Sequence, residues 1–187
     1  MRIEGIQFYD FNSVNEGLRL TNRSAPTPDE KEIVEDIPYM QGVLDFSMLL
    51  GERVFNNRTL TYSFYTKSMS YRKRKSLEQR IKRLLSVQGE GNLYDTHDQG
   101  YYWLGKVVSS RVVDNPTFNR LEVEVTFNVY PFMIRNKSYF DDVWDDFNFE
   151  SDVAGYTQFE VDGTRTINLY NAGDTTVTPT IIVEVSE

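Results

Sequence analysis

Residues 70–88, SYRKRKSLEQRIKRLLSVQ, are the one stretch of the chain in which apolar side chains recur at helical spacing. These side chains stand at i, i+4, i+7 and i+8, on one face of a helix: Leu77, Ile81, Leu84 and Leu85. Burying this face contributes roughly 6–12 kcal/mol before the ordering entropy is subtracted, at about 1.5–3 kcal/mol per side chain. The pattern therefore predicts a helix docked on a sheet.

The other faces of this predicted helix are strongly basic. Residues 71–87 contain seven Lys or Arg and one acid, Glu78, a net charge of +6 in a chain of net charge −8. Cations in the first turn oppose the helix macrodipole by about 0.3–1 kcal/mol each. Only Glu78 and Lys82 are spaced as a well-oriented pair. An unfavourable cluster of this kind calls for an acidic partner, a solvated face or a bound phosphate.

We expect the basic residues of the helix to meet an acidic surface of a neighbouring subunit or partner protein. The candidate interface residues are Arg72, Lys73, Arg74, Lys75, Arg80 and Arg83. A fully solvated face is the equally simple alternative. Phosphate is less favoured, because no aromatic side chains alternate with the basic ones as in a single-strand binder.

The bulk composition narrows the function classes. The 187 residues are 40% hydrophobic and 14% aromatic, and they include no cysteine, so disulfides, thiolate metal sites and cysteine nucleophiles are excluded. The acidic balance argues against specific nucleic-acid binding. No apolar run has the length of a signal peptide or a membrane span. We therefore expect a soluble protein made in the cytoplasm, with no membrane partner.

Strand patterns surround the helix. Apolar and polar residues alternate over 59–66 (TLTYSFYT) and over 121–129 (LEVEVTFNV), and the second run should form a hairpin with 101–113. Further strands are expected at 2–11, 18–21, 31–37, 43–47 and 93–96, with a polar loop at 22–30. The fold class predicted is mainly β, a β-sandwich or split-barrel-like sheets, with one α-helix packed on the sheet.

Charge divides the chain into two predicted domains. Residues 141–187 contain eleven acids and one base, Arg165. We predict that 1–137 form a β domain with one helix at about 70–88. Residues 138–187 would form an acidic connector followed by a partial second β domain, with strands near 157–161, 164–169 and 180–185.

Few residues have the pattern of a chemical site. Asp95, His97 and Asp98 form one cluster, but they lie in a predicted turn where Asp is expected for backbone capping. The acids at 141–146 lack the Gly and closing Glu of a calcium loop, which favours a solvated linker. We therefore predict no catalytic, cofactor or metal site, and no enzyme activity.

Two passages resemble the N-terminal domain of the distal tail proteins of siphophages. The first is 38–47 (PYMQGVLDFS), a turn, a Gly and a strand with Asp, and the second is 93–108 (LYDTHDQGYYWLGKVV), a short strand, a turn and an aromatic strand. Asn171, Gly173 and Pro179 are similar to the segment that opens the family's galectin-like second domain. By this resemblance, residues 138–187 would include the start of that second domain.

The resemblance implies an architectural role. Members of this family form a hexameric ring that joins the tail tube protein to the tail-tip hub or tail-lysin protein at the distal tail or baseplate, without cofactors. The resemblance places the chain in the virion at the phage tail tip, synthesised in the host cytoplasm from a phage or prophage gene. Residues 1–137 would then be the ring-forming domain.

Other functions are open from the residues alone. A carbohydrate-binding β-sandwich module for host recognition would need exposed aromatic side chains on one face, for which the candidates are Tyr101, Tyr102, Trp103 and Trp144. A nucleic-acid binder would act through the basic helix and lose affinity steeply with salt.

Overall fold

The computed structural model describes residues 4–49, 51–136, 160–169, 181 and 183. By its contacts the chain divides into two units, Met1–Asn136 and Lys137–Glu187. Most of the second unit lies outside the described residues, including the acidic connector and most of the strands expected at 157–161 and 180–185. The assignment of a partial second β domain to 138–187 therefore stays a prediction.

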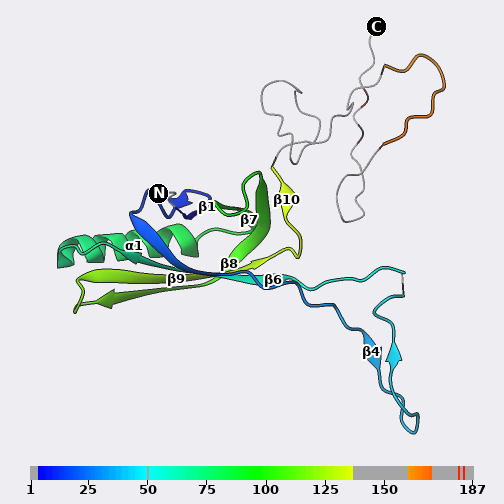
Figure 1. Cartoon of the computed structure of the whole chain (residues 1–187), viewed down its shortest axis with the longest axis horizontal. Helices are drawn as coiled ribbons and strands as arrows, with labels where there is room; N and C mark the ends of the chain where they lie inside the picture. Colours follow the sequence, from blue (N-terminus) through cyan, green and yellow to red (C-terminus); the bar gives the residue numbers. More distant parts are fainter. Residues whose placement is uncertain (1–3, 50, 137–159, 170–180, 182, 184–187) are drawn as a thin grey trace. The chain divides into compact units, whose positions relative to one another are not determined.

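The first unit is mainly β with one helix, as predicted, and Figure 1 shows its elements. In chain order they are β1 (Ile6–Phe8), β2 (Phe11–Asn12), β3 (Leu18–Ser24), β4 (Val34–Glu35), β5 (Leu44–Asp45), β6 (Arg58–Thr66), α1 (Tyr71–Ser86), β7 (Gly91–Asp95), β8 (Tyr101–Asn115), β9 (Arg120–Val129) and β10 (Ile134–Arg135).

The strands form one large antiparallel sheet and one small hairpin. The large sheet has the order β2-β1-β7-β8-β9-β6-β3, with β10 paired to β8, whereas β4 and β5 pair only with each other. The predicted hairpin of β8 and β9 is confirmed, from Gly105 opposite Val129 to Asn115 opposite Arg120. Backbone groups are left unpaired among the described strands along the outer side of β3 and along residues 106–115 of β8.

The core lies between this sheet and α1. Alternate residues of β6 and β9 are buried, as their sequence pattern predicts: Leu60, Tyr62, Phe64, Leu121, Val123, Val125, Phe127 and Val129. From the helix, Ile81 and Leu85 are buried, and Leu77 and Leu84 pack against the same cluster half-buried. The helical spacing of 70–88 thus identified both the helix and its buried face.

Three expectations about strand extent were wrong. Residues 2–11 do not form one strand, because the chain turns at Tyr9, whose φ is 49°, and β2 pairs back on β1. The polar loop begins later than expected, since β3 continues to Ser24 opposite Thr61 of β6. Residues 164–169, expected as a strand, have no strand in the structure.

The strands expected at 31–37 and 43–47 shorten to the two-residue β4 and β5. Among the described elements, these two strands contact only each other. An isolated two-stranded hairpin is marginal in water because no second layer covers its apolar side chains. Gly42, in the turn between them, has the positive φ (80°) that its position predicted.

No helix of the described residues is both long and apolar enough to cross a membrane.

Gly105 provides a direct test of the β8–β9 register. A Cβ added at this position would collide with the backbone oxygen of Asn128 and lie 2.7 Å from the Cα of Val129. We predict that Gly105→Ala lowers the free energy of unfolding by about 1–3 kcal/mol, as overpacking does. Gly89→Ala is the matched control, because nothing lies within 4 Å of its added Cβ. Equal urea midpoints for the two variants would show that the register is wrong.

Candidate protein-interaction surfaces

Some cations of α1 form ion pairs within the unit, and others are exposed to solvent. Lys75 and Lys82 both donate to Glu78, at 2.9 and 2.7 Å, which confirms the predicted Glu78–Lys82 pair and adds a second one. Arg80 pairs with Glu16 at 2.9 Å although its side chain is exposed. Within the described residues no ion pair reaches the other exposed cations, Arg72, Lys73 and Arg83.

Arg74 does not belong to the predicted interaction surface. Its side chain is only 5% exposed, and it donates to Asp114 at 2.7 Å, to the Met69 carbonyl at 2.8 Å and to Asn119 at 3.0 Å. The guanidinium therefore fastens the start of α1 to the turn between β8 and β9. Its charge is compensated inside the unit, which removes one of the cations that seemed to oppose the helix macrodipole.

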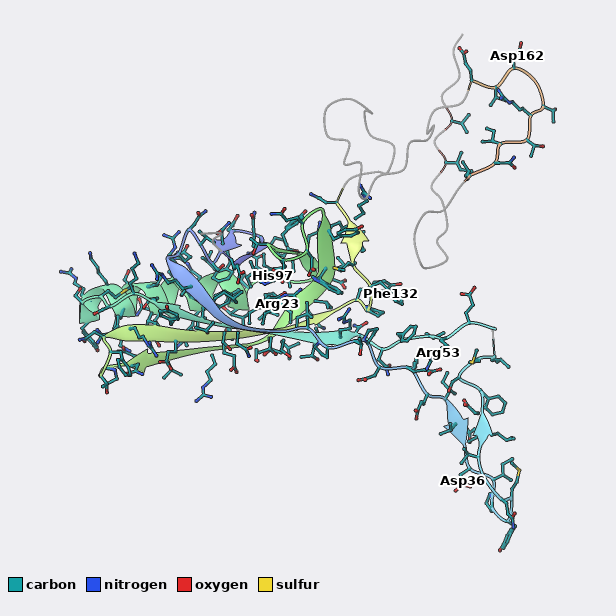
Figure 2. All side chains as sticks on the ribbon, in the orientation of Figure 1. Arg23, Asp36, Arg53, His97, Phe132 and Asp162 are labelled. Carbon is teal, nitrogen blue, oxygen red and sulfur yellow. The ribbon has the colours of Figure 1, made fainter. Side chains whose placement is uncertain are left out.

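His97 and Asp98 lie in a turn, as predicted, and Asp95 is the last residue of β7, just before that turn. Asp95 accepts a hydrogen bond from the backbone N–H of His97 at 2.9 Å, and the Nδ1 atom of His97 lies 3.3 Å from the same carboxylate. The cluster also includes Arg23, which the sequence did not identify: its Nε donates to Asp95 at 2.6 Å and its Nη2 donates to Asp98 (Figure 2).

The side chain of Asp95, in β7, connects this strand to β3 and β6 by hydrogen bonds. Its side chain is fully buried, and one carboxylate oxygen accepts from both Arg23 of β3 and the Tyr62 hydroxyl of β6, the latter at 2.8 Å. Burial alone would raise the pKa of Asp95, but the His97 N–H, Arg23 and Tyr62 outweigh it and leave that pKa below its usual value. Burial beside Asp95 raises the pKa of Tyr62. The arrangement ties β7 to β3 and to β6.

Among the described residues, no cluster of three or more His, Cys, Asp or Glu side chains could hold a metal ion. A shallow depression of about 260 Å³ lies beside the Asp95 turn, lined by groups that include Gln7, Asn12, Tyr94 and Asp98. Its acidic side chains are already occupied, because Asp95 and Asp98 both pair with Arg23.

The aromatic residues considered for carbohydrate binding do not form an exposed face. Trp103 is 2% exposed, and the Arg58 guanidinium lies 4.6 Å from its ring centre. Tyr101 and Tyr102 are half-buried, and Trp144 lies outside the described residues. Trp103 is thus a core aromatic, and the alternative of an aromatic platform does not hold for this residue.

The sequence analysis missed the most exposed apolar surface of the unit. We use "the arm" for residues 25–57, which carry β4 and β5. Eleven large apolar side chains of the arm are exposed: Ile33, Val34, Ile37, Tyr39, Met40, Val43, Leu44, Phe46, Met48, Leu49 and Val54. An exposed apolar surface of this extent is typical of a protein interface. The sequence did carry a sign of this surface, because apolar residues are frequent over 33–49 although no helix or long strand was expected there to pack against them.

The base of the arm is firmly attached to the large sheet. Arg58 donates to the carbonyl oxygens of Ala25, Pro26 and Pro131, at 3.3, 2.7 and 3.3 Å. Phe55 packs edge-on against Phe132 with ring centres 5.5 Å apart. Glu30 and Arg53, on the two sides of the arm, form an ion pair. The arm is thus anchored where it leaves and rejoins the sheet.

Asp95→Asn tests the buried cluster. We predict a loss of about 1–3 kcal/mol in the free energy of unfolding at pH 7, because Arg23 loses its buried charged partner and keeps only Asp98. The folded-state pKa of Asp95 is lowered, so its contribution is present above the unfolded pKa of about 3.9 and is lost as the pH falls through the folded value. Urea unfolding of both proteins should therefore show a difference that shrinks below about pH 4. A constant difference down to pH 2 would count against the ion pair.

Arg74→Ala and Arg72→Ala separate the inward and outward cations of the helix. Loss of Arg74 leaves the half-buried Asp114 and the side chain of Asn119 without this donor, so we predict that the free energy of unfolding falls by about 1.5–3 kcal/mol. Loss of the exposed Arg72 should change stability by less than about 0.5 kcal/mol. Thermal unfolding followed by circular dichroism measures both, and equal losses would mean that Arg74 is not buried.

Comparison with known proteins supports the fold. No protein-family model and no curated protein matches the sequence. Among solved structures, the chain is similar to the Dit protein of SPP1, described as a paradigm of the hub adsorption apparatus in phages that infect Gram-positive hosts. The TM-score is 0.56 at 8% identity, over 68% of this chain and 50% of that chain. A tail of an empty GTA particle with C6 symmetry is also similar, with a TM-score of 0.32 at 9% identity over 73% of this chain and 86% of that one.

The SPP1 likeness shows a shared fold, and the chain spans about half the length of that protein. The resemblance to distal tail proteins drawn from residues 38–47 and 93–108 is therefore confirmed at the level of the fold.

Proposed function

We propose that this protein is a structural component of the distal end of a phage tail, where it forms a hexameric ring that joins the tail tube to the tail-tip apparatus. The role is architectural and involves no catalysis. The protein is then a part of the virion, made in the host cytoplasm before assembly. The shared fold with a hub protein supports this proposal.

The observation that carries the proposal is the arm. Eleven exposed large apolar side chains on one segment are unfavourable for a protein that works as a monomer, because each would be stabilised by removal from water. The arm is nevertheless anchored at its base by Arg58 and by the Phe55–Phe132 contact. An anchored segment with an uncovered apolar surface is the expected feature of an assembly protein.

The large sheet offers two further unpaired edges. β3 is its last strand, and residues 106–115 of β8 pair only with β9 among the described strands, because β7 ends its pairing at Gly105. Two different edges of one molecule can serve a head-to-tail contact, which closes into a ring when the rotation between copies fits. The arrangement is therefore compatible with cyclic assembly.

Solution mass tests the ring. We predict an assembly of about 131 kDa, six times the 21.9 kDa of one chain, by light scattering at micromolar concentration or after addition of the tail tube protein. Six-fold rings should be visible by negative-stain electron microscopy of the same sample. A mass near 22 kDa under both conditions would contradict the proposal.

A further inference from the structure

We propose that the arm of one copy docks on the start of α1 and the β8–β9 turn of a second copy. The inference rests on the proposed function and extends it, because it names the two surfaces that meet. Both surfaces combine exposed apolar side chains with charged groups, and their charges are opposite.

The arm supplies the acidic half of the contact. Its residues 32–52 contain five acids and no Lys or Arg, a net charge of −5. Glu32, Glu35 and Asp36 are exposed beside the apolar residues of β4 and β5, and Asp36 is marked on the arm in Figure 2. An apolar surface flanked by carboxylates fits a partner that is apolar and basic.

The start of α1 supplies such a surface. Arg72 and Lys73 are exposed cations without an ion pair in the described residues. Tyr71 is 63% exposed beside them, and Phe118, in the turn between β8 and β9, is 58% exposed. Arg74 ties the two segments together through Asp114 and Asn119, so Tyr71, Phe118 and the two cations belong to one rigid surface.

The geometry of β6 makes this a contact between copies. The arm rejoins the sheet at Arg58, the first residue of β6, and α1 follows Thr66, the last. A nine-residue strand is about 30 Å long, so the base of the arm and the start of the helix lie at opposite ends of one strand. Arg58 and Phe55 hold the base of the arm in place at its own end. With the arm at one end of the molecule and its docking surface at the other, successive copies would bind head to tail.

Cross-linking tests the contact directly, because the chain has no cysteine of its own. Gln41→Cys places a thiol near the arm turn, and Ser76→Cys places one on the exposed face of α1, one turn after Arg72. The two variants are mixed and treated with a short bismaleimide. As a matched control, Ser76→Cys is replaced by Gln99→Cys, an exposed residue between β7 and β8.

We expect the arm–helix pair to give several-fold more dimer on a denaturing gel than the arm–Gln99 pair. Equal yields from the two pairs would overturn the inference. A hexamer with equal cross-linking yields would support the ring and contradict the arm–helix contact. Arm–helix dimers in a sample that never reaches six-fold mass would support the contact and contradict the ring. The two proposals can therefore fail separately.

Charge exchange tests the same contact without a cross-linker. Arg72→Glu with Lys73→Glu should raise the concentration needed for assembly about tenfold, since like charges would then face each other. Adding Glu35→Lys and Asp36→Lys should restore assembly. The matched control adds Asp10→Lys and Glu90→Lys, which change the net charge equally at exposed positions outside the arm. Equal restoration by both pairs, or no effect of the first pair, would overturn the inference.

Discussion

Packing of α1 against β8 and β9 is the interaction on which the rest of the first unit depends. Ile81 and Leu85 from the helix belong to the same buried core as alternate residues of β6 and β9. A sheet has two faces, and one helix covers only one of them. The arm lies outside this core, so its apolar residues have no layer to pack on within the described unit.

The same packing decides which cations of the helix are available to a partner. Arg74 points inward and holds the β8–β9 turn, while Lys75 and Lys82 share Glu78. Of the exposed cations without an ion pair in the described residues, Arg72 and Lys73 stand on one surface with Tyr71 and Phe118, whereas Arg83 lies in the last turn of the helix. A basic helix in an acidic protein is thus divided into a structural part and an accessible part, and only the accessible part can meet the acidic arm.

Sequence reasoning succeeded where the determining contacts are local. The helix, β6 and β9 follow from periodicity within single segments, as does the turn at Asp95. It failed where partners lie far apart in the chain: Arg74 binds Asp114 and Asn119, and Arg23 binds Asp95. Polarity alone placed Arg74 on the surface, because no local pattern reveals a distant carboxylate. Similarly, the strand expected at 31–37 gave no sign that, among the described elements, no second layer covers it.

Hydrogen exchange on the assembled protein tests the central claim, that the arm is an assembly element, most directly. Amide exchange is compared between a dilute sample and a concentrated, assembled one. The account predicts that exchange in residues 33–49 and at the start of α1 slows markedly on assembly, while exchange in the buried strands β6 and β9 is unchanged. Equally fast exchange of residues 33–49 in both samples would contradict it.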